Sequence, residues 1–347
     1  MIRRASIARG KALLPARAFA WCRRHAVGTG MKVLIAGATG ALGIPLVRAL
    51  IAGGHEVLGL SRTPEKSSRL ATLGAQPIIA DVMDCDGLLR AVEGRQADAI
   101  MHVLTALPKS GPLHHRDMYP TDTLRDVGTA NLLTAARKVG ARKILVESMH
   151  LGYGYGDWGK IVLTEKQPFA PPGRTRALER HLAAFRSMEQ QIFEATRAGR
   201  IEGISLRFGA FYGPGATDQI VKQLQNQRMP LPGDGHAIMS WIYIEDAAAA
   251  LVSALERGKA GEAYNIVDDE PVTLRDFLTA LAQAVGTRAP RSIPGFLLRL
   301  AAPYAYTFLC ATSLRASNAK ARQELGWTPG VPTYREGVRG IAQALAR

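Results

Sequence analysis

The chain has 347 residues, of which 47% are hydrophobic and 6% aromatic, and its 44 Lys and Arg residues outnumber 29 Asp and Glu residues to give a net charge of +15. This composition excludes a disordered or collagen-like chain, and the length allows one large α/β domain or two smaller ones. Residues 1–30 hold seven basic residues and no acidic one, so the rest of the chain carries only +8. That moderate excess gives no reason to expect nucleic acid as a partner.

The first thirty residues need not belong to the fold. They are rich in Arg and Ala, lack acids and end in Gly28-Thr29-Gly30. The composition resembles a mitochondrial presequence, which would direct the protein to the matrix, whereas Pro15 and Arg17 interrupt the apolar run that a secretory signal needs. A stretch upstream of the natural start also fits, because Met31 is followed at once by a strand pattern. We expect residues 1–30 to be disordered or removed. We expect the protein to be cytoplasmic, or to lie in the mitochondrial matrix if these residues are a presequence.

Membrane spans and metal or disulfide sites are not expected. No window holds 18 uninterrupted apolar residues, and the closest, residues 293–312, is broken by Pro294, Arg299 and Pro303. That stretch is more typical of amphipathic helices that pack on a core or line a pocket. The three cysteines include no C-x-x-C pair, so we predict no metal site and a reducing compartment.

From Met31 onward, short apolar runs alternate with amphipathic segments. We expect strands at residues 32–36, 56–60, 77–80, 99–104, 143–146 and 203–207. We expect helices that end at Gly53-Gly54 and that cover about 122–139, 177–198 and 245–256. Continuous apolar strands suit a sheet buried on both faces. The pattern predicts an α/β fold, a Rossmann-like doubly wound parallel sheet over 31–210, with a smaller C-terminal substrate-binding lobe at 211–347 that is partly interleaved with the sheet.

A glycine turn follows the first expected strand. Its residues are Gly37, Ala38, Thr39, Gly40, Ala41, Leu42 and Gly43, a G-x-x-G-x-x-G sequence that opens into a helix. In such a turn the first glycine permits the bend, the second lets backbone approach a pyrophosphate, and the third lets helix and strand pack closely. Helix N-terminal amides then meet the phosphate charge. We predict that this turn binds a dinucleotide cofactor.

The end of the second strand bears on which cofactor binds. A site for NAD usually offers a carboxylate to the ribose 2′-hydroxyl, but Ser61 and Arg62 stand here. A guanidinium suits a 2′-phosphate and has no acceptor for a hydroxyl. We therefore predict NADP(H), with NAD(H) as the second choice. The alternative is that Arg62 is a solvated loop cation or stacks on adenine.

Further segments match a known family in order along the chain. They are VLIAGATGALG at 33–43 and residues 79–82, 101–105, 128–133, 206–215, 241–248, 263–266 and 325–329. Residues 31–347 thereby resemble the extended short-chain dehydrogenase/reductase superfamily, the NAD-dependent epimerase/dehydratase group. The resemblance implies a small-molecule substrate, and it suggests a homodimer formed through the helices near 122–139 and 177–198.

The resemblance also implies further cofactor contacts. It places Asp81 and Val82 near adenine and the fourth-strand segment beside a cofactor ribose. The residues it adds to the cofactor site are Val103, Leu104, Thr105, Ser148, Phe208 and Gly209.

The family's catalytic pattern is incomplete in this chain. Family enzymes use a serine after the fifth strand and a Tyr-x-x-x-Lys helix, in which the tyrosine exchanges a proton while hydride moves to or from nicotinamide. No Tyr-x-x-x-Lys occurs here. Alignment on Glu189 places His181 at the tyrosine position and Phe185 at the lysine position. Either Ser148 or Met149 takes the serine position.

Three side chains are candidate replacements. Ser148 can donate a hydrogen bond to substrate or nicotinamide, and His181 can act as an acid or base near neutral pH. Tyr153, or its neighbour Tyr155, can supply a phenol from a glycine-rich loop. The alternatives are that His181 is a surface or capping residue and that both tyrosines are structural aromatics. We expect an NAD(P)-dependent oxidoreductase or epimerase acting on a small carbonyl, hydroxyl or sugar-nucleotide-like substrate. The alternative is a catalytically inactive NADP(H)-binding sensor or regulator.

Overall fold

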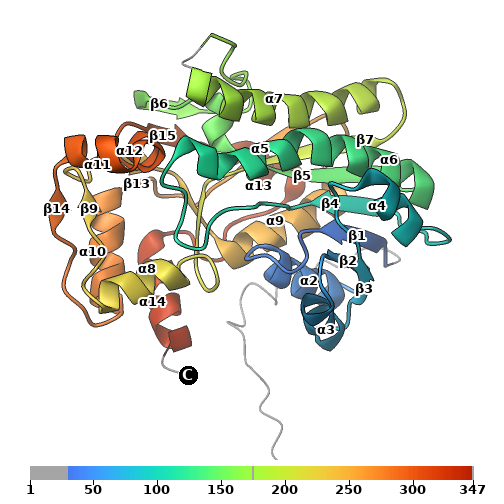
Figure 1. Ribbon diagram of the computed structural model, residues 1–347, viewed down its shortest axis with the longest axis horizontal. Coiled ribbons are helices and arrows are strands. Elements are labelled where there is room, and N and C mark those ends of the chain that lie inside the picture. Colours follow the sequence, from blue (N-terminus) through green and yellow to red (C-terminus); the bar gives the residue numbers. More distant parts are fainter. Residues whose placement is uncertain (1–29, 174–175, 346–347) are drawn as a thin grey trace, which may run out of the picture.

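Seven parallel strands form the central sheet of the computed structural model, which describes residues 30–173 and 176–345 (Figure 1). The extension expected at 1–30 lies outside the described residues, apart from Gly30. In sheet order the strands are β12 (Ala263–Ile266), β7 (Glu202–Phe208), β5 (Lys143–Met149), β4 (Ala99–His102), β1 (Lys32–Ala36), β2 (Glu56–Ser61) and β3 (Gln76–Ile79). The predicted Rossmann-like α/β fold is confirmed.

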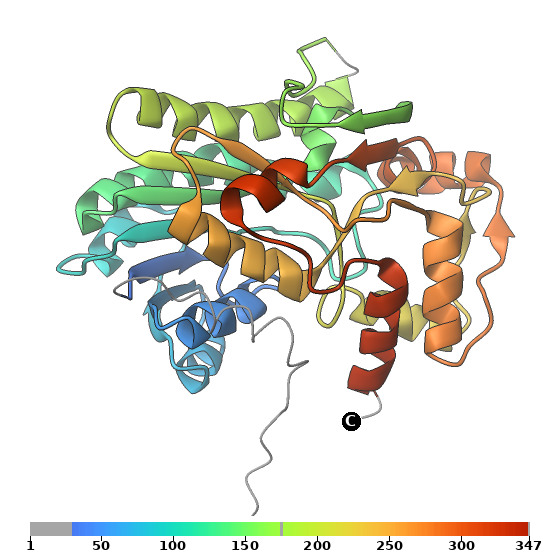
Figure 2. The same ribbon diagram turned by 180° about the vertical axis from the view of Figure 1, so that it is seen from behind.

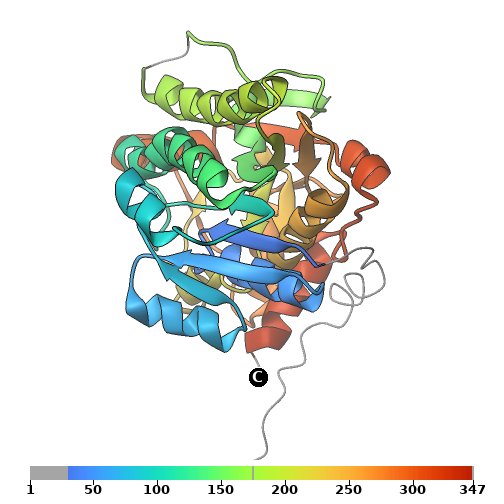
Figure 3. The same cartoon turned by 90° about the vertical axis from the view of Figure 1, so that its right-hand side faces the viewer.

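Helices cover both faces of this sheet, so its strands are apolar on both sides. Val33 and Ile35 point to a core shared with α2 (Gly43–Ala52), α3 (Pro64–Thr72), α9 (Ile244–Arg257) and α13 (Ala319–Leu325). Leu34 and Ala36 alternate to the other face, which is covered by α4 (Cys85–Ala91), α6 (Thr129–Val139) and α7 (Arg176–Arg197). Figure 2 shows α9 crossing the first face, and Figure 3 shows the strands between the two layers.

A second lobe lies beside the carboxyl edge of the sheet. Its four-stranded sheet runs in the order β13 (Val272–Thr273), β10 (Ile238–Met239), β15 (Ser313–Ala316) and β6 (Asp157–Leu163). The lobe also contains two separate pairs of strands: β11 (Trp241–Tyr243) with β8 (Ala210–Tyr212), and β14 (Ser292–Ile293) with β9 (Leu231–Pro232). Its helices are α8 (Asp218–Gln225), α10 (Leu274–Ala284), α11 (Gly295–Ala301), α12 (Pro303–Leu309) and α14 (Tyr334–Leu345). The strand β12 and the helix α9 follow residue 211 but belong to the main sheet, so the chain passes between the two parts.

Two expected helical segments differ from the sequence pattern. The helix expected at 122–139 is α5 (Tyr119–Thr123), a π-helical turn at Leu124–Gly128 and then α6, and a 3-10 turn at His115–Met118 precedes it. A π turn rotates the side chains that follow it out of α-helical phase. Within residues 293–312, α12 buries Tyr304 and Ala305, whereas α11 buries none of its residues. No helix among the described residues is long and apolar enough to cross a membrane.

A buried ion pair holds α7 against the sheet. Glu189 on α7 accepts from the Arg207 guanidinium through both carboxylate oxygens, at 2.9 and 2.7 Å, and from the Ser205 hydroxyl at 2.7 Å. Arg207 and Glu189 are 6% and 5% exposed. Their mutual attraction offsets the cost of burial only while both partners are present.

We expect the substitution Glu189→Ala to lower the free energy of unfolding by about 3–5 kcal/mol, because it leaves the Arg207 charge buried and unpaired. Urea unfolding followed by circular dichroism measures the change. Glu93→Ala is the matched control, since it breaks a solvent-exposed pair with Lys138 and should leave the midpoint almost unchanged. Equal midpoints for the two variants would contradict the assigned role of Glu189.

Candidate active site

The glycine turn has the geometry of a phosphate-binding loop. Gly37 has a φ of +101°, and a Cβ there would lie 2.3 Å from the Val103 carbonyl oxygen. A Cβ on Gly43 would lie 2.0 Å from the Gly37 carbonyl oxygen, so both positions require glycine. Gly40 and Ala41 are exposed, and a Cβ on Gly40 would meet only the Gly37 oxygen, at 3.2 Å. The exposed turn at Gly40 and Ala41, just before α2, therefore leaves room for a pyrophosphate at the carboxyl end of β1.

The rest of the turn lies at the same edge. Thr39 is half-buried and Leu42 is buried at the start of α2. The strand order reverses between β1 and β4, which is where a doubly wound sheet binds its ligand.

The end of β2 presents a cation, Arg62, that has no partner among the described residues. The Ser61 hydroxyl donates to the Thr63 carbonyl at 3.0 Å and accepts from the Thr63 amide at 3.4 Å, so it is used within the turn. Arg62 is exposed, and no carboxylate within residues 30–173 and 176–345 pairs with it. Its guanidinium is free for a ligand phosphate.

The other predicted cofactor residues occupy two groups of positions. Asp81 and Val82 follow β3, and Val103, Leu104 and Thr105 follow β4, all at the edge that holds the glycine turn. Asp81 and Thr105 are exposed, Leu104 is half-buried, and the two valines are buried. Their cofactor contacts stay predictions.

Phe208 ends β7 and Gly209 follows it, and the backbone of each already has a hydrogen-bond partner. His150 Nδ1 lies 2.8 Å from the Phe208 carbonyl oxygen, and the Gly209 amide donates to the Ile266 carbonyl at 3.0 Å. A Cβ on Gly209 would lie 2.6 Å from the Ser240 carbonyl oxygen. The fold therefore accounts for the glycine here, and a cofactor contact stays a prediction.

Ser148 and Tyr153 have contrasting surroundings. Ser148 is fully buried near the carboxyl end of β5, and its Oγ has no hydrogen-bond partner among the described residues. The Tyr153 hydroxyl accepts from Arg207 at 2.9 Å and donates to Asn265 at 2.9 Å. Burial raises the Tyr153 pKa, while the Arg207 charge opposes the rise. Ser148 is free to bond a ligand, whereas Tyr153 would have to leave a buried network.

His181 is the centre of a hydrogen-bonded chain that the sequence did not indicate. Its Nδ1 lies 2.7 Å from Asp122 Oδ2, and its Nε2 lies 3.0 Å from His115 Nδ1. His181 is 0% and Asp122 3% exposed, whereas His115 is half-buried. The two imidazole rings stack with their centroids 5.3 Å apart. Helices α5 and α7 and the 3-10 turn after β4 each contribute one of the three groups.

The Asp122–His181–His115 chain has a defined order of hydrogen-bond donors and acceptors. A carboxylate only accepts, so His181 Nδ1 carries a hydrogen toward Asp122, and neutral His181 then accepts from His115 Nδ1. Both nitrogens of His181 are thus used, and the nitrogen left for a substrate is His115 Nε2. Burial and the neighbouring His181 lower the His115 pKa from its usual 6.5. The paired histidines at 114–115 were the available sequence signal, whereas Asp122 lies within an expected helix and carried none.

Two tyrosines cover the histidine pair. Tyr304 on α12 places its ring 5.6 Å from that of His115 and 5.4 Å from that of His181. Its hydroxyl lies 3.1 Å from the hydroxyl of Tyr155, which follows β5. Burial raises the Tyr304 pKa to about 12 and the Tyr155 pKa well above 10. Both phenols therefore stay protonated at neutral pH, and they join the second lobe to the site.

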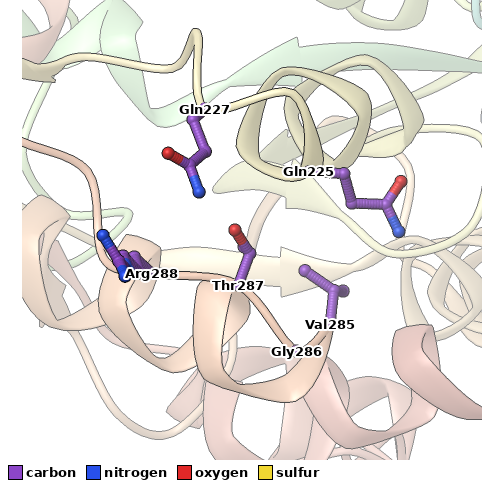
Figure 4. Close-up of a pocket in the computed structure, with 6 residues that line it drawn as sticks. All are labelled: Gln225, Gln227, Val285, Gly286, Thr287 and Arg288. Carbon is purple, nitrogen blue, oxygen red and sulfur yellow. The ribbon is translucent and has the colours of Figure 1, made fainter.

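A cavity of about 520 Å³ lies elsewhere, between the ends of α8 and α10 in the second lobe (Figure 4). Its walls are Gln225, Gln227, Val285, Gly286, Thr287 and Arg288. None of these is a predicted site residue. The cofactor edge and the histidine chain, rather than this cavity, carry the groups suited to catalysis.

Comparison with known proteins agrees with this fold. The model of the NAD dependent epimerase/dehydratase family matches residues 33–267. A 3-diazoavenalumate denitrifying reductase of a Streptomyces species is 32% identical over 312 residues, 89% of this chain and 99% of the relative. A 2-alkyl-3-oxoalkanoate reductase of Stenotrophomonas maltophilia is 30% identical over 285 residues, 75% of this chain and 77% of the relative.

Solved structures share the fold at lower identity. UDP-glucose 4-epimerase of Thermotoga maritima is 20% identical with a TM-score of 0.75, over 91% of this chain and 99% of that one. A dTDP-glucose 4,6-dehydratase of Bacillus anthracis, in complex with NAD, is 18% identical with a TM-score of 0.73, over 91% and 97%. These relatives are enzymes, and their fold is the one found here. The chain belongs to the NAD dependent epimerase/dehydratase family.

Proposed function

We propose that the protein is an NADP(H)-dependent reductase that delivers a hydride to a small carbonyl compound and draws the accompanying proton from His115. The observation that carries this proposal is the Asp122–His181–His115 chain. Its central residue, His181, occupies the position on α7 that the family resemblance assigns to the catalytic tyrosine. It replaces a phenol with an imidazole whose proton affinity lies near neutral pH.

When bound, the cofactor supplies the hydride, and residues of the protein supply the proton. Protonated His115 donates from Nε2 to the carbonyl oxygen as the hydride reaches the carbonyl carbon, which yields an alcohol and neutral His115. His115 regains its Nε2 proton from water after the alcohol leaves, while neutral His181, oriented by buried Asp122, keeps accepting from His115 Nδ1 and so holds the ring in place. Tyr304 and Tyr155 cover the rings and limit access of water.

The preference for NADP(H) is supported by the free guanidinium of Arg62. The solved relatives that contain NAD say only what those proteins bind. A sensor without turnover has no support from the named relatives, which are reductases and epimerases.

Removing the terminal imidazole should abolish most carbonyl reduction. We expect His115→Ala to lower kcat/KM by about 10²–10⁴-fold, the usual contribution of general acid catalysis. NADPH oxidation followed at 340 nm with a panel of 3-oxoacids, ketones and aldehydes measures it. The matched control is His114→Ala, because His114 is a half-exposed neighbour that takes no part in the Asp122–His181–His115 hydrogen bonds.

The pH profile provides the second readout of the same variant. Reduction needs protonated His115, whose pKa is lowered, so activity should be full at acidic pH and decline as pH rises through a value below 6.5. Oxidation of the alcohol should show the opposite trend. A profile that His115→Ala leaves unchanged would refute this assignment.

The cofactor preference depends on one exposed side chain. We expect Arg62→Gln to weaken NADPH binding by about tenfold and to leave NADH binding nearly unchanged, because only NADPH carries the 2′-phosphate. Fluorescence titration of both reduced cofactors measures this. Arg69→Gln on α3, also an exposed arginine, controls for the general loss of charge. Tighter binding of NADH than of NADPH by the unaltered protein would exclude NADP(H) as the preferred cofactor.

A second candidate function is reductive removal of N₂ from an aromatic diazonium compound. The Streptomyces relative, named as a denitrifying reductase, favours it, as does the missing Tyr-x-x-x-Lys pair. Replacement of the N₂ group by hydride gives Ar–H and N₂, so the balanced step consumes a hydride and no external proton. This reaction does not need the phenol that the family uses.

The two candidates respond differently to the same variant. We expect His115→Ala to lose carbonyl reduction while it keeps NADPH-dependent release of N₂ from an aryl diazonium salt, measured by gas chromatography. Carbonyl turnover without any N₂ release would leave the first candidate alone. NADPH binding with no turnover of carbonyls, diazonium salts or UDP-glucose would favour the sensor.

A further inference from the structure

Arg125 is a buried cation without a hydrogen bond. It lies in the π-helical turn Leu124–Gly128 and is 3% exposed. Its guanidinium carbon stands 4.0 Å over the Phe185 ring, and its Nη1 lies 3.7 Å from Asp122 Oδ1, beyond hydrogen-bond distance. Among the described residues, Nη1 has no acceptor and Asp122 Oδ1 has no donor.

Such a pair is incomplete as it stands. The two groups form an ion pair at 3.7 Å, but a buried guanidinium nitrogen and a buried carboxylate oxygen each cost free energy while they lack a hydrogen bond. A group that accepts from Nη1 and donates to Oδ1 would satisfy both. A hydroxyl does both, whereas a carboxylate or a phosphate only accepts and would be repelled by Asp122. The geometry thus favours a ligand hydroxyl.

The position of Arg125 indicates which hydroxyl. His102, the last residue of β4, bonds through Nε2 to the Leu124 carbonyl at 3.1 Å, which ties the π turn to that strand end. Arg125 also acts on the next strand: burial raises the pKa of Glu147 on β5 to about 7, and the Arg125 charge opposes that rise. The guanidinium therefore lies near the carboxyl ends of β4 and β5.

The strand order then assigns a part of the cofactor. The glycine turn ends β1, and Arg62 follows β2 on one side of it, whereas β4 and β5 lie on the other side. If the pyrophosphate binds at the turn and the 2′-phosphate at Arg62, the nicotinamide riboside extends over the ends of β4 and β5. The polar groups of its sugar are two hydroxyls.

We propose that Arg125, together with Asp122 Oδ1, binds the ribose hydroxyls on the nicotinamide side of the cofactor. This inference rests on the proposed binding of NADP(H). It gives the buried guanidinium the acceptor it lacks and Asp122 the donor it lacks. It also couples cofactor binding to the proton chain, because Asp122 bonds His181 through its other oxygen.

The test compares a whole cofactor with half of one. NADPH contains both ribosides, whereas 2′,5′-ADP contains only the adenosine half. Dissociation constants of both are measured by fluorescence and calorimetry for the unaltered protein, Arg125→Met and Arg125→Lys. Methionine can still pack on the Phe185 ring, so the substitution removes the charge and the donors while keeping much of the apolar contact.

We expect Arg125→Met to weaken NADPH binding about tenfold or more, the usual effect of losing a hydrogen bond to a charged group, and to leave 2′,5′-ADP binding unchanged. Arg125→Lys keeps the charge and should recover part of the loss. Arg180→Met is the matched control, since Arg180 stacks on Tyr119 with its guanidinium carbon 3.9 Å from the ring and lies 4.0 Å from Asp122 Oδ2, yet is exposed. It should leave both constants unchanged.

Three results would overturn the inference. Equal weakening of NADPH and 2′,5′-ADP would show a general effect on the fold, and unchanged constants for both would show that only water occupies the gap. Unchanged NADPH binding with a raised KM for an oxoacid would show that Arg125 binds the substrate and not the cofactor. If Arg125→Met does not fold, Arg125→Lys decides by the same ratio. Because binding is measured without turnover, a failure of carbonyl reduction leaves this test intact.

Discussion

The buried pair of Glu189 and Arg207 fixes the element on which the site depends. It bonds α7 to β7 through both carboxylate oxygens, and Arg207 holds the Tyr153 hydroxyl as well. The loop after β5, the helix and the strand are therefore locked to one another by one guanidinium. His181 and Phe185 lie on the same helix, within the two turns before Glu189. Their positions relative to the cofactor edge follow from this interaction.

If His115 is the acid, as proposed, the proton donor lies on the turn after β4 instead of on α7, and different parts of the fold must hold it in place. A tyrosine on a long helix is positioned by the helix itself, whereas His115 lies in a four-residue 3-10 turn. Its imidazole is held from one side by His181 and from another by Tyr304 on α12. Under this proposal, proton transfer requires the second lobe to be packed against the first, because Tyr304 of that lobe contacts the His115 ring.

From the sequence, only the local parts of the candidate site could be predicted, and their cofactor contacts stay predictions. The glycine turn and Arg62 each follow a strand directly, and their function depends on residues that are neighbours in the chain. Asp122 and His115 meet His181 across 59 and 66 residues, and no periodicity records such a contact. The π turn at Leu124–Gly128 also breaks the helical phase, so helical spacing would misplace Arg125. For Tyr153 the sequence left two roles open, a phenol for catalysis or a structural aromatic, because its partners Arg207 and Asn265 lie on distant strands.

Two arginines would then act on opposite halves of one cofactor by different physics. Arg62 is exposed, so its attraction to a phosphate is screened by salt and contributes to the approach of a polyanion. Arg125 is enclosed, where salt has little access and hydrogen-bond geometry dominates. The exposed cation suits selection of the phosphorylated cofactor from solution. The buried one suits alignment of the nicotinamide with the proton chain, because the carboxylate beside it, Asp122, is the one that orients His181.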